Sequence, residues 1–449
     1  MSIDLAIHTQ LQLVLLGWVV VVALVTHWTV RYRAGGMTLA AVLVTTYLYQ
    51  GCFTFVFPGY SPEAGTRFGY LAALGFNGET VALGSWISLL GLAGLAAGFR
   101  VSLALSSRAR RVTMTPQARP ATAKTLKVVL VGAAILGFGL NSLRVQFPMS
   151  GATLEWARNC GTAGIALGLL TARSRRAKLI WWSGAGMIFL IYLSSGFLSY
   201  TFLMLTVVVS VAWVHGGLWG GPSLRSLSAL LLAYGCSLLF FIVWMNGRTE
   251  FRETISQGRT DYEALLEPNA SDDWSTGRAF DLANERLNQP FFIGRMAQYL
   301  GRNPDLFENG RTIEIIPLAL VPRPLWPEKP GRGGAAEMSR YTGLEFSRTA
   351  TIGTGPIFGL YVNYGWLGVL LGMGVFGMAL GALDRLLGVR IQSGDLRGAA
   401  ILMLVSIPFC DPYLTPFFIA NGVMFAGLAS GLAFRVILGQ RRSARHLAT

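Results

Sequence analysis

Charged side chains are scarce in this sequence. Asp, Glu, Lys and Arg make up 13% of its 449 residues, whereas hydrophobic residues make up 53%. Soluble globular domains typically carry about 25% charged residues, because they must coat their surface with polar groups. The scarcity of charge therefore excludes a soluble globule of this length and indicates an integral membrane protein.

Cysteine and histidine are also rare, with four residues of each type. All four cysteines fall in apolar segments, and their spacing suits neither a disulfide framework nor a zinc site. We interpret them as small apolar side chains. They are Cys52, Cys160, Cys236 and Cys410.

Apolar runs of membrane-spanning length recur along the chain. A helix needs about 20 apolar residues to cross the hydrocarbon core, and about 11 segments approach that length. The sequence therefore predicts an all-α, polytopic integral membrane protein with about 11 transmembrane helices. The predicted spans are residues 11–30, 37–57, 81–105, 127–147, 152–172, 179–197, 198–215, 226–246, 364–387, 398–411 and 413–435.

Lys and Arg gather after the odd-numbered predicted helices, for example at Arg31 and Arg33 and again at Arg173, Arg175 and Arg176. Short basic loops stay on the cytoplasmic side of the membrane. The pattern predicts an N-terminus outside and a basic C-terminus in the cytoplasm. The first apolar run lacks the flanks of a cleavable signal, so we expect that helix to be retained.

The chain divides into three parts. Residues 1–246 hold predicted helices 1–8, residues 247–352 form one large outer loop of about 106 residues containing short helices, and residues 353–449 hold helices 9–11 and the cytoplasmic C-terminus. A connection this long is typically a functional element.

The net charge of +15 is unevenly distributed. Residues 247–352 carry 12 Arg and 1 Lys against 15 acidic residues, whereas the rest of the chain carries 24 basic and 7 acidic residues. The excess outside the loop is the positive-inside pattern together with attraction to anionic lipids, and no basic-aromatic nucleic-acid module occurs. We therefore expect membrane lipids as partners, and no nucleic acid.

The first half of the loop contains one amphipathic helical pattern. In "GRAFDLANERLNQPFFIGRMAQYL", apolar residues recur at helical spacing, which predicts a helix with a kink at Pro290. We expect its apolar face to lie on the bilayer surface. Asn309-Gly310 then predicts a turn, and the short "RTIEIIPLALV" that follows suits a re-entrant or interfacial dip.

The end of the loop reads "VPRPLWPEKPGRGG", residues 321–334. Its prolines remove amide hydrogens and disfavour helix, so we expect an extended strap. Trp326 in this strap suits the headgroup level of the membrane. The next stretch, "AAEMSRYTG", predicts a short helix that ends at Gly343 and carries Glu337, Arg340 and Tyr341 on one face.

Twelve arginines in one outer loop favour an anionic ligand, because the forked guanidinium binds phosphate oxygens in pairs. The alternative is that these arginines pair with the fifteen loop acids on a solvated surface. The cationic candidates for substrate binding in the loop are Arg248, Arg278, Arg286, Arg295, Arg311, Arg323, Lys329 and Arg340.

Several residues near the outer ends of predicted helices are further candidates for substrate binding. Arg158 follows Glu155 by three positions, and the two residues either mark a site or satisfy each other. Tyr361 and Asn363 come at the start of the helix after the loop. Asn363 either binds substrate or caps a kink.

The strap carries a resemblance to a family. "PLALVPRPLWPEKP", followed by "TGPIFGLYVNYGWLGVLLGMGVFGMALGAL", resembles the Wzy-type oligosaccharide repeat-unit polymerases, also called O-antigen polymerases. The local match covers residues 317–381, and elsewhere the likeness is one of topology. The motif ends the large periplasmic loop in that family.

The resemblance implies an activity and a location. Members are glycosyltransferases of the bacterial inner membrane that join undecaprenyl-diphosphate-linked oligosaccharides on the periplasmic face. The growing glycan is transferred to the non-reducing end of a new lipid-linked unit. By the motif, Arg323 would hold the diphosphate with Lys329 beside it. A repeat-unit flippase and a chain-length regulator are the partners implied.

The chemistry this implies needs fixed positive charge on the departing diphosphate and a base for the attacking sugar hydroxyl. Arg323 is the candidate for the first role. Glu337, Asp305 and Glu314 are the candidate bases, with Glu337 preferred; its alternative is an ion pair with Arg340. No Asp-x-Asp signature occurs, so we expect no required metal and no cofactor.

Three other functions stay open. An O-antigen ligase has a similar architecture, but the outer loop of that family carries a functional histidine and residues 247–352 contain none. A transporter of lipid-linked sugars would place charges deep within several helices. A non-catalytic subunit of a polysaccharide export machine is the third alternative.

Overall fold

The structure is a computed structural model of the chain. It describes residues 2–48, 77–108, 120–142, 150–193, 198–216, 223, 225–226, 228, 289–314, 325, 334–346 and 353–411. All regular secondary structure within these ranges is helical, which agrees with the predicted all-α class.

Most of the described helices coincide with predicted membrane spans. Three are long and apolar enough to cross a membrane, over Ile7–Arg31, Gly78–Leu105 and Gly355–Gln392, and three shorter helices are also apolar. These helices indicate a membrane protein. The described helices that coincide with predicted spans are α1 (Ser2–Arg31), α2 (Met37–Leu48), α5 (Gly78–Arg108), α6 (Pro120–Ser142), α7 (Ser150–Thr171), α8 (Arg175–Leu193), α9 (Leu198–Val214), α15 (Gly355–Gln392), α16 (Leu396–Ser406) and the 3-10 helix η7 (Ile407–Cys410).

Two predicted spans, residues 226–246 and 413–435, lie almost entirely or entirely outside the described residues. The total of about 11 helices therefore stays a prediction. The helix after the loop was predicted over residues 364–387, whereas α15 begins nine residues earlier, at Gly355. Gly355 lies directly before Pro356, and proline is well tolerated in the first turn of a helix.

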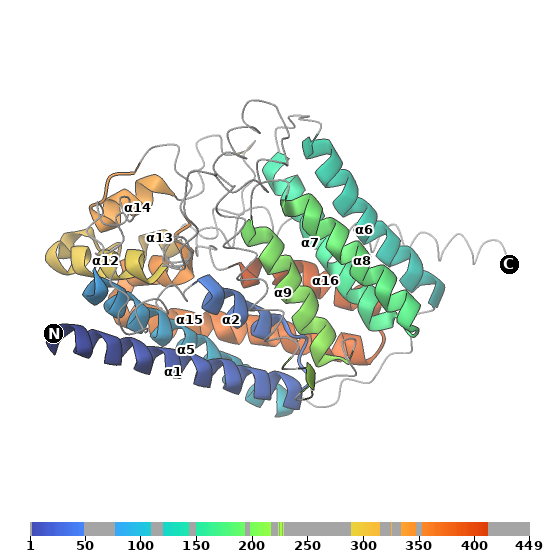
Figure 1. Cartoon of the computed structure of the whole chain (residues 1–449), viewed down its shortest axis with the longest axis horizontal. Coiled ribbons are helices and arrows are strands. Elements are labelled where there is room, and N and C mark those ends of the chain that lie inside the picture. Colours follow the sequence, from blue (N-terminus) through green and yellow to red (C-terminus); the bar gives the residue numbers. More distant parts are fainter. Residues whose placement is uncertain are drawn as a thin grey trace, which may run out of the picture.

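The contact between α5 and α15 forms the centre of the fold (Figure 1). Glycines let the two backbones touch: a Cβ atom at Gly98 would collide with the Gly374 carbonyl oxygen, and one at Gly377 would collide with that of Leu95. Small residues permit this close approach of membrane helices. α1 packs along α5, while α7 packs mainly with α6, α8, α9 and α16.

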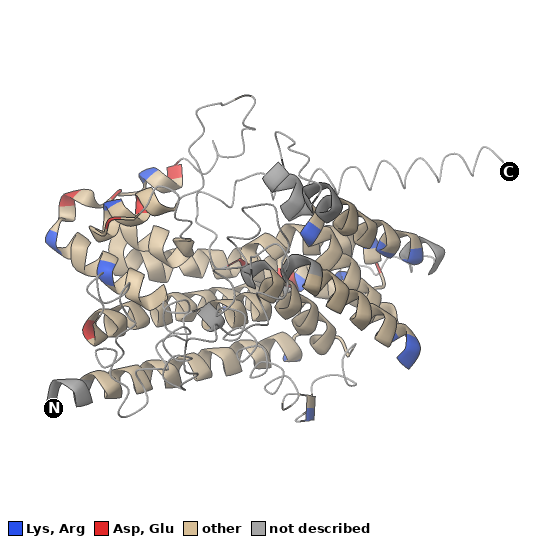
Figure 2. Cartoon of the chain, turned by 45° about the horizontal axis from the view of Figure 1, so that its top comes forward, with Lys and Arg blue, Asp and Glu red and all other residues tan. Residues whose placement is uncertain are grey.

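Four short helices lie at the end of the fold where α1 begins (Figure 1). They are α12 (Gln289–Arg302), the 3-10 helix η4 (Pro304–Leu306), α13 (Arg311–Glu314) and α14 (Ala335–Thr342). In Figure 2 the long apolar helices are tan along most of their length, and the acidic residues, drawn in red, occur mainly on this end unit. The predicted loop therefore supplies a polar cap on an apolar helical body.

α12 packs against α5, so the expectation that its apolar face lies on the bilayer surface is wrong. Phe291, Met296 and Leu300 of that face are buried. The helices are in backbone contact, since a Cβ atom at Gly84 would collide with the Pro290 carbonyl. No side chain separates the two backbones at this point. The apolar face of α12 is therefore covered by α5 and not by lipid. The predicted helix upstream of Gln289 lies outside the described residues.

The opposite end of α15 is joined to the turn between α1 and α2. Asp384 of α15 is fully buried; its Oδ1 accepts a hydrogen bond from the Met37 amide at 2.8 Å and its Oδ2 one from the Thr38 amide at 3.2 Å. These are the first amides of α2, which have no partner within their own helix. The carboxylate therefore caps α2 from a distant helix.

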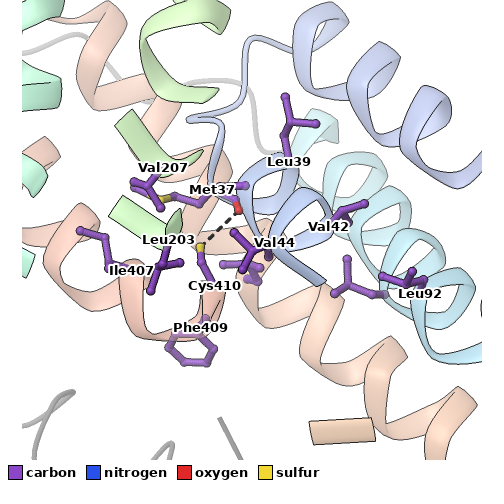
Figure 3. Close-up of a cluster of buried hydrophobic side chains, with 14 of the residues drawn as sticks. Met37, Leu39, Val42, Val44, Leu92, Leu203, Val207, Ile407, Phe409 and Cys410 are labelled. Atoms are coloured by element: carbon purple, nitrogen blue, oxygen red, sulfur yellow. Dashed lines mark hydrogen bonds between the residues drawn. The ribbon is translucent and has the colours of Figure 1, made fainter. Parts of the chain in front are cut away.

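An apolar cluster surrounds this junction (Figure 3). The Cys410 thiol donates to the Met37 carbonyl at 3.4 Å, and Leu203 and Val207 of α9 lie beside it. Cys160 and Cys410 are both buried free thiols, as the interpretation of cysteine as an apolar side chain predicts. Cys52 and Cys236 lie outside the described residues.

Candidate functional site

Residues 303–314, α14 and the first turns of α15 form one packed unit, which we call the cap site. Two hydrogen bonds attach the loop segment to α15. The Glu308 amide donates to the Val362 carbonyl at 3.0 Å, and the Gly310 amide donates to Asn363 Oδ1 at 2.9 Å. Residues that are distant in sequence are thereby held at the end of the apolar helices.

The predicted Asn309-Gly310 turn is confirmed. Both residues have positive φ, 47° and 97°, which asparagine and glycine tolerate better than other residues. The side chain of Tyr364 packs against Gly310, where its hydroxyl occupies the position that a Cβ atom would take. The turn therefore fits the start of α15 only with glycine at position 310.

α15 is kinked at Tyr364 and Gly365, where the backbone leaves helical geometry. Gly365 has φ 59° and ψ −144°, a conformation that is open mainly to glycine. The Asn363 side-chain amide donates to Thr312 Oγ1 at 2.6 Å and to the Gly359 carbonyl at 2.7 Å. Asn363 therefore stabilises the kink and the loop, which matches the capping alternative.

Glu308 is the centre of the cap site, and the sequence analysis did not select it. The side chain is buried, and its Oε1 lies 2.7 Å from Arg340 Nη2 and accepts a 2.7 Å hydrogen bond from the Tyr341 hydroxyl. Within the described residues, Oε2 accepts no hydrogen bond. The one signal that singles Glu308 out in the sequence is its place immediately before the Asn-Gly turn.

α14 forms as predicted, from Ala335 to Thr342, and Gly343 ends it in the left-handed conformation with φ 68°. The Arg340 guanidinium lies 5.3 Å from the centre of the Tyr341 ring, and its side chain is 58% exposed. Arg340 is paired with Glu308, so the alternative ion pair between Glu337 and Arg340 is wrong. The predicted pair rested on helical spacing alone, whereas in the fold Arg340 pairs with Glu308 from a distant part of the sequence.

Two titratable groups of the cap site have shifted pKa values. Burial raises the pKa of the Glu337 carboxyl, and the Thr354 hydroxyl opposes the rise. Burial also raises the pKa of the Tyr341 hydroxyl, with a further contribution from its hydrogen bond to Glu308. Tyr341 therefore remains a proton donor, and Glu337 is a stronger base than an exposed glutamate.

The other predicted candidates that the structure describes differ in their surroundings. Asp305, Glu314 and Arg311 are exposed on η4 and α13. Arg295 is half-buried on α12, and its Nε is buried without a hydrogen-bond partner among the described residues. Tyr361 is buried, with its ring centre 6.3 Å from those of Phe307 and Trp366.

Arg158 is not part of the cap site. It is buried on α7, and α7 packs mainly against α6, α8, α9 and α16. The predicted candidates Arg248, Arg278, Arg286, Arg323, Trp326 and Lys329 lie outside the described residues.

Of the strap, the structure describes only Leu325 and Gly334. Leu325 has 3-10 conformation and is 77% exposed, so the expectation of extended backbone is wrong at this residue. The φ value that proline imposes suits a 3-10 turn as well as extended chain.

Among the described residues, no three His, Cys, Asp or Glu side chains are grouped so that they could hold a metal ion. Comparisons with protein-family models, curated proteins and solved structures found no match to this chain. The chemistry of the cap site is therefore inferred from its own residues.

Proposed function

We propose that this chain is a membrane glycosyltransferase that polymerises oligosaccharide units carried on undecaprenyl diphosphate. The observation that carries the proposal is the cap site itself: acids and arginines from the predicted loop meet at one end of apolar helices. A lipid-linked substrate needs such a place, with its chain in the bilayer and its diphosphate and sugars outside. The resemblance of residues 317–381 to Wzy-type polymerases supplies the reaction.

The arginines are proposed to bind the diphosphate. Arg340 presents an exposed guanidinium that is held at one side by Glu308, and Arg311 is exposed on α13 of the same cap site. Arg323 and Lys329 join them in the proposal because of the strap motif. Fixed positive charge stabilises the anion that departs when the bond between the sugar C1 and the diphosphate oxygen breaks.

Glu337 is proposed as the base that takes the proton from the attacking sugar hydroxyl as the new bond to C1 forms. Its raised pKa supports this role, because a base works best when its pKa approaches the working pH. Glu308 is proposed as a positioning residue, since Oε1 is engaged by both Arg340 and Tyr341. Asp305 and Glu314 stay alternative bases; both are exposed at the same end.

The test is polymerisation by purified protein in nanodiscs. The protein is incubated with undecaprenyl-diphosphate repeat units, and glycan length is read by gel and mass spectrometry. We expect a ladder of multiples of the repeat unit that Glu337→Gln and Arg340→Ala abolish or strongly shorten. Arg302→Ala, which removes an exposed arginine at the end of α12, serves as the matched control and should retain the ladder.

Other outcomes point to other functions. Transfer of the glycan to a lipid A acceptor without lengthening would indicate a ligase. Movement of unchanged substrate across a vesicle membrane would indicate a transporter. Unchanged substrate in both assays, with a folded protein, would contradict the proposed enzyme.

A further inference from the structure

A second site lies at the end of the helical body opposite the cap site. A cleft of about 380 Å³ opens between α6, the end of α15 and the start of α16. Volumes of about 300 to 1,000 Å³ are typical of sites for small ligands. Its lining combines apolar side chains with two arginines, which is the pattern of a site for an amphipathic molecule.

The polar side of the cleft is made by Arg390, Asp395 and Arg397. Arg390 Nη1 lies 3.0 Å from Asp395 Oδ2, and Asp395 Oδ1 accepts the Gly398 amide at 3.0 Å, capping α16. Asp395 is thus fully engaged by the protein. Arg397 is half-buried, and no described residue provides it with a hydrogen bond or an ion pair. The described lining of the cleft therefore has one more positive charge than negative charge, and that extra charge has no partner among the described residues.

The apolar side is formed by Leu126 of α6, Leu386 of α15 and Ile401 and Leu402 of α16. Leu126 is buried, whereas Leu386 is 49% exposed, so the cleft is open to the surroundings of the helical body. Leu386 lies within the apolar stretch of α15 that is long enough to cross a membrane, four residues before Arg390. Apolar and cationic lining residues of the cleft are therefore about one helical turn apart on α15.

Other cationic and aromatic groups mark the same end of the protein. Lys127 of α6 lies 5.8 Å from the centre of the Trp181 ring, and Lys124 is exposed one turn earlier. Lysines that pair with tryptophan are typical of the boundary between lipid tails and headgroups. The basic loops at Arg33 and Arg175 predict that this boundary faces the cytoplasm, whose membrane leaflet carries anionic lipids.

We infer that this cleft binds an anionic phospholipid of the surrounding bilayer, with its phosphate on Arg397 and Arg390 and its acyl chain on Leu126, Leu386 and Leu402. Basic pockets between membrane helices on the cytoplasmic side are suited to such headgroups. A free phosphate ion would use the cations but leave the apolar wall without a partner. The inference is independent of the proposed polymerase function.

The test measures lipid selectivity of the purified full-length chain. Spin-labelled phosphatidylglycerol and spin-labelled phosphatidylcholine are each added to the protein in nanodiscs, and the immobilised fraction is compared. We expect preferential immobilisation of phosphatidylglycerol. Arg397→Gln should weaken the preference by about fivefold, which is the effect of about 1 kcal/mol for one cation near an anionic surface. Arg397→Lys should restore part of it.

The controls separate the possible sources of a result. Arg175→Gln removes an exposed arginine from the start of α8 at the same end and should keep the preference. Equal immobilisation of the two lipids, or an unchanged preference in a folded Arg397→Gln variant, would overturn the inference. Competition by millimolar inorganic phosphate as effective as that by phosphatidylglycerol would show a site for free phosphate and would also overturn it.

Discussion

The Tyr341 hydroxyl donates a 2.7 Å hydrogen bond to Glu308 Oε1, across 33 positions of sequence. Replacing Tyr341 with Phe should destabilise the fold by about 1.5 to 3 kcal/mol, because a hydrogen bond to a buried charged group is lost. Thermal unfolding in detergent measures the change. Tyr32→Phe, at a partly buried tyrosine whose hydroxyl has no hydrogen bond to a described residue, is the control and should alter stability little. Equal effects of the two substitutions would contradict the role given to the Tyr341 hydroxyl.

The raised pKa of Glu337 predicts a pH-dependent effect of Glu337→Gln. Folding favours the neutral carboxyl, so its contribution to stability is fully present below the pKa of the unfolded chain and is lost as pH rises through the folded pKa. Glutamine stays neutral at every pH. The variant should therefore gain stability relative to the parent as pH rises from 4 to 7, measured by thermal unfolding. The same gain in Glu345→Gln, at an exposed glutamate, would show that the effect does not come from burial of Glu337.

The contact between α5 and α12 predicts different outcomes for two glycines of α12. A Cβ atom at Gly294 would collide with the Thr80 carbonyl oxygen, whereas one at Gly301 would meet nothing within 4 Å. Gly294→Ala should lower the unfolding temperature because the backbones must separate. Gly301→Ala should leave it unchanged or raise stability by up to about 1 kcal/mol, since alanine favours helix. A tolerated alanine at position 294 would rule out the close contact.

Asp384 supplies the acceptors for the first amides of α2. Asp384→Ala should destabilise the protein by about 1 to 3 kcal/mol for each buried donor left without an acceptor. Asp384→Asn keeps one carbonyl oxygen and should have an intermediate effect. Folded yield in detergent and unfolding temperature are the measurements. An alanine variant as stable as the parent would refute the capping role.

Arg323 carries the motif-based part of the proposed function. Arg323→Ala should abolish glycan lengthening while leaving the protein inserted in the membrane, because the departing diphosphate loses a fixed positive charge. Glycan length in vivo and the amount of membrane-inserted protein are measured together, with Arg302→Ala as the control. Normal glycan lengths in the Arg323 variant would refute this assignment.

Local sequence predicted the elements whose conformation depends on neighbouring residues. α14 spans the predicted residues, and it ends as expected because Gly343 can adopt positive φ. The turn at Asn309-Gly310 forms because both of its residues also tolerate positive φ. Glu308 could not be found in this way. Its partners Arg340 and Tyr341 are joined to it only through the fold, and no spacing along a helix or strand relates them.

The sequence by itself determined that this is an all-helical membrane protein, because runs of apolar residues have few other stable environments. It also determined where most of the described helices lie. The tertiary structure decided which faces meet: α12 lies on α5 where the sequence suggested the bilayer, and Asp384 caps a helix that begins 347 positions earlier. An apolar face is covered equally well by lipid or by protein, so hydrophobicity alone does not choose between them. The backbone contact at Gly84 and Gly294 decides that α12 packs on α5.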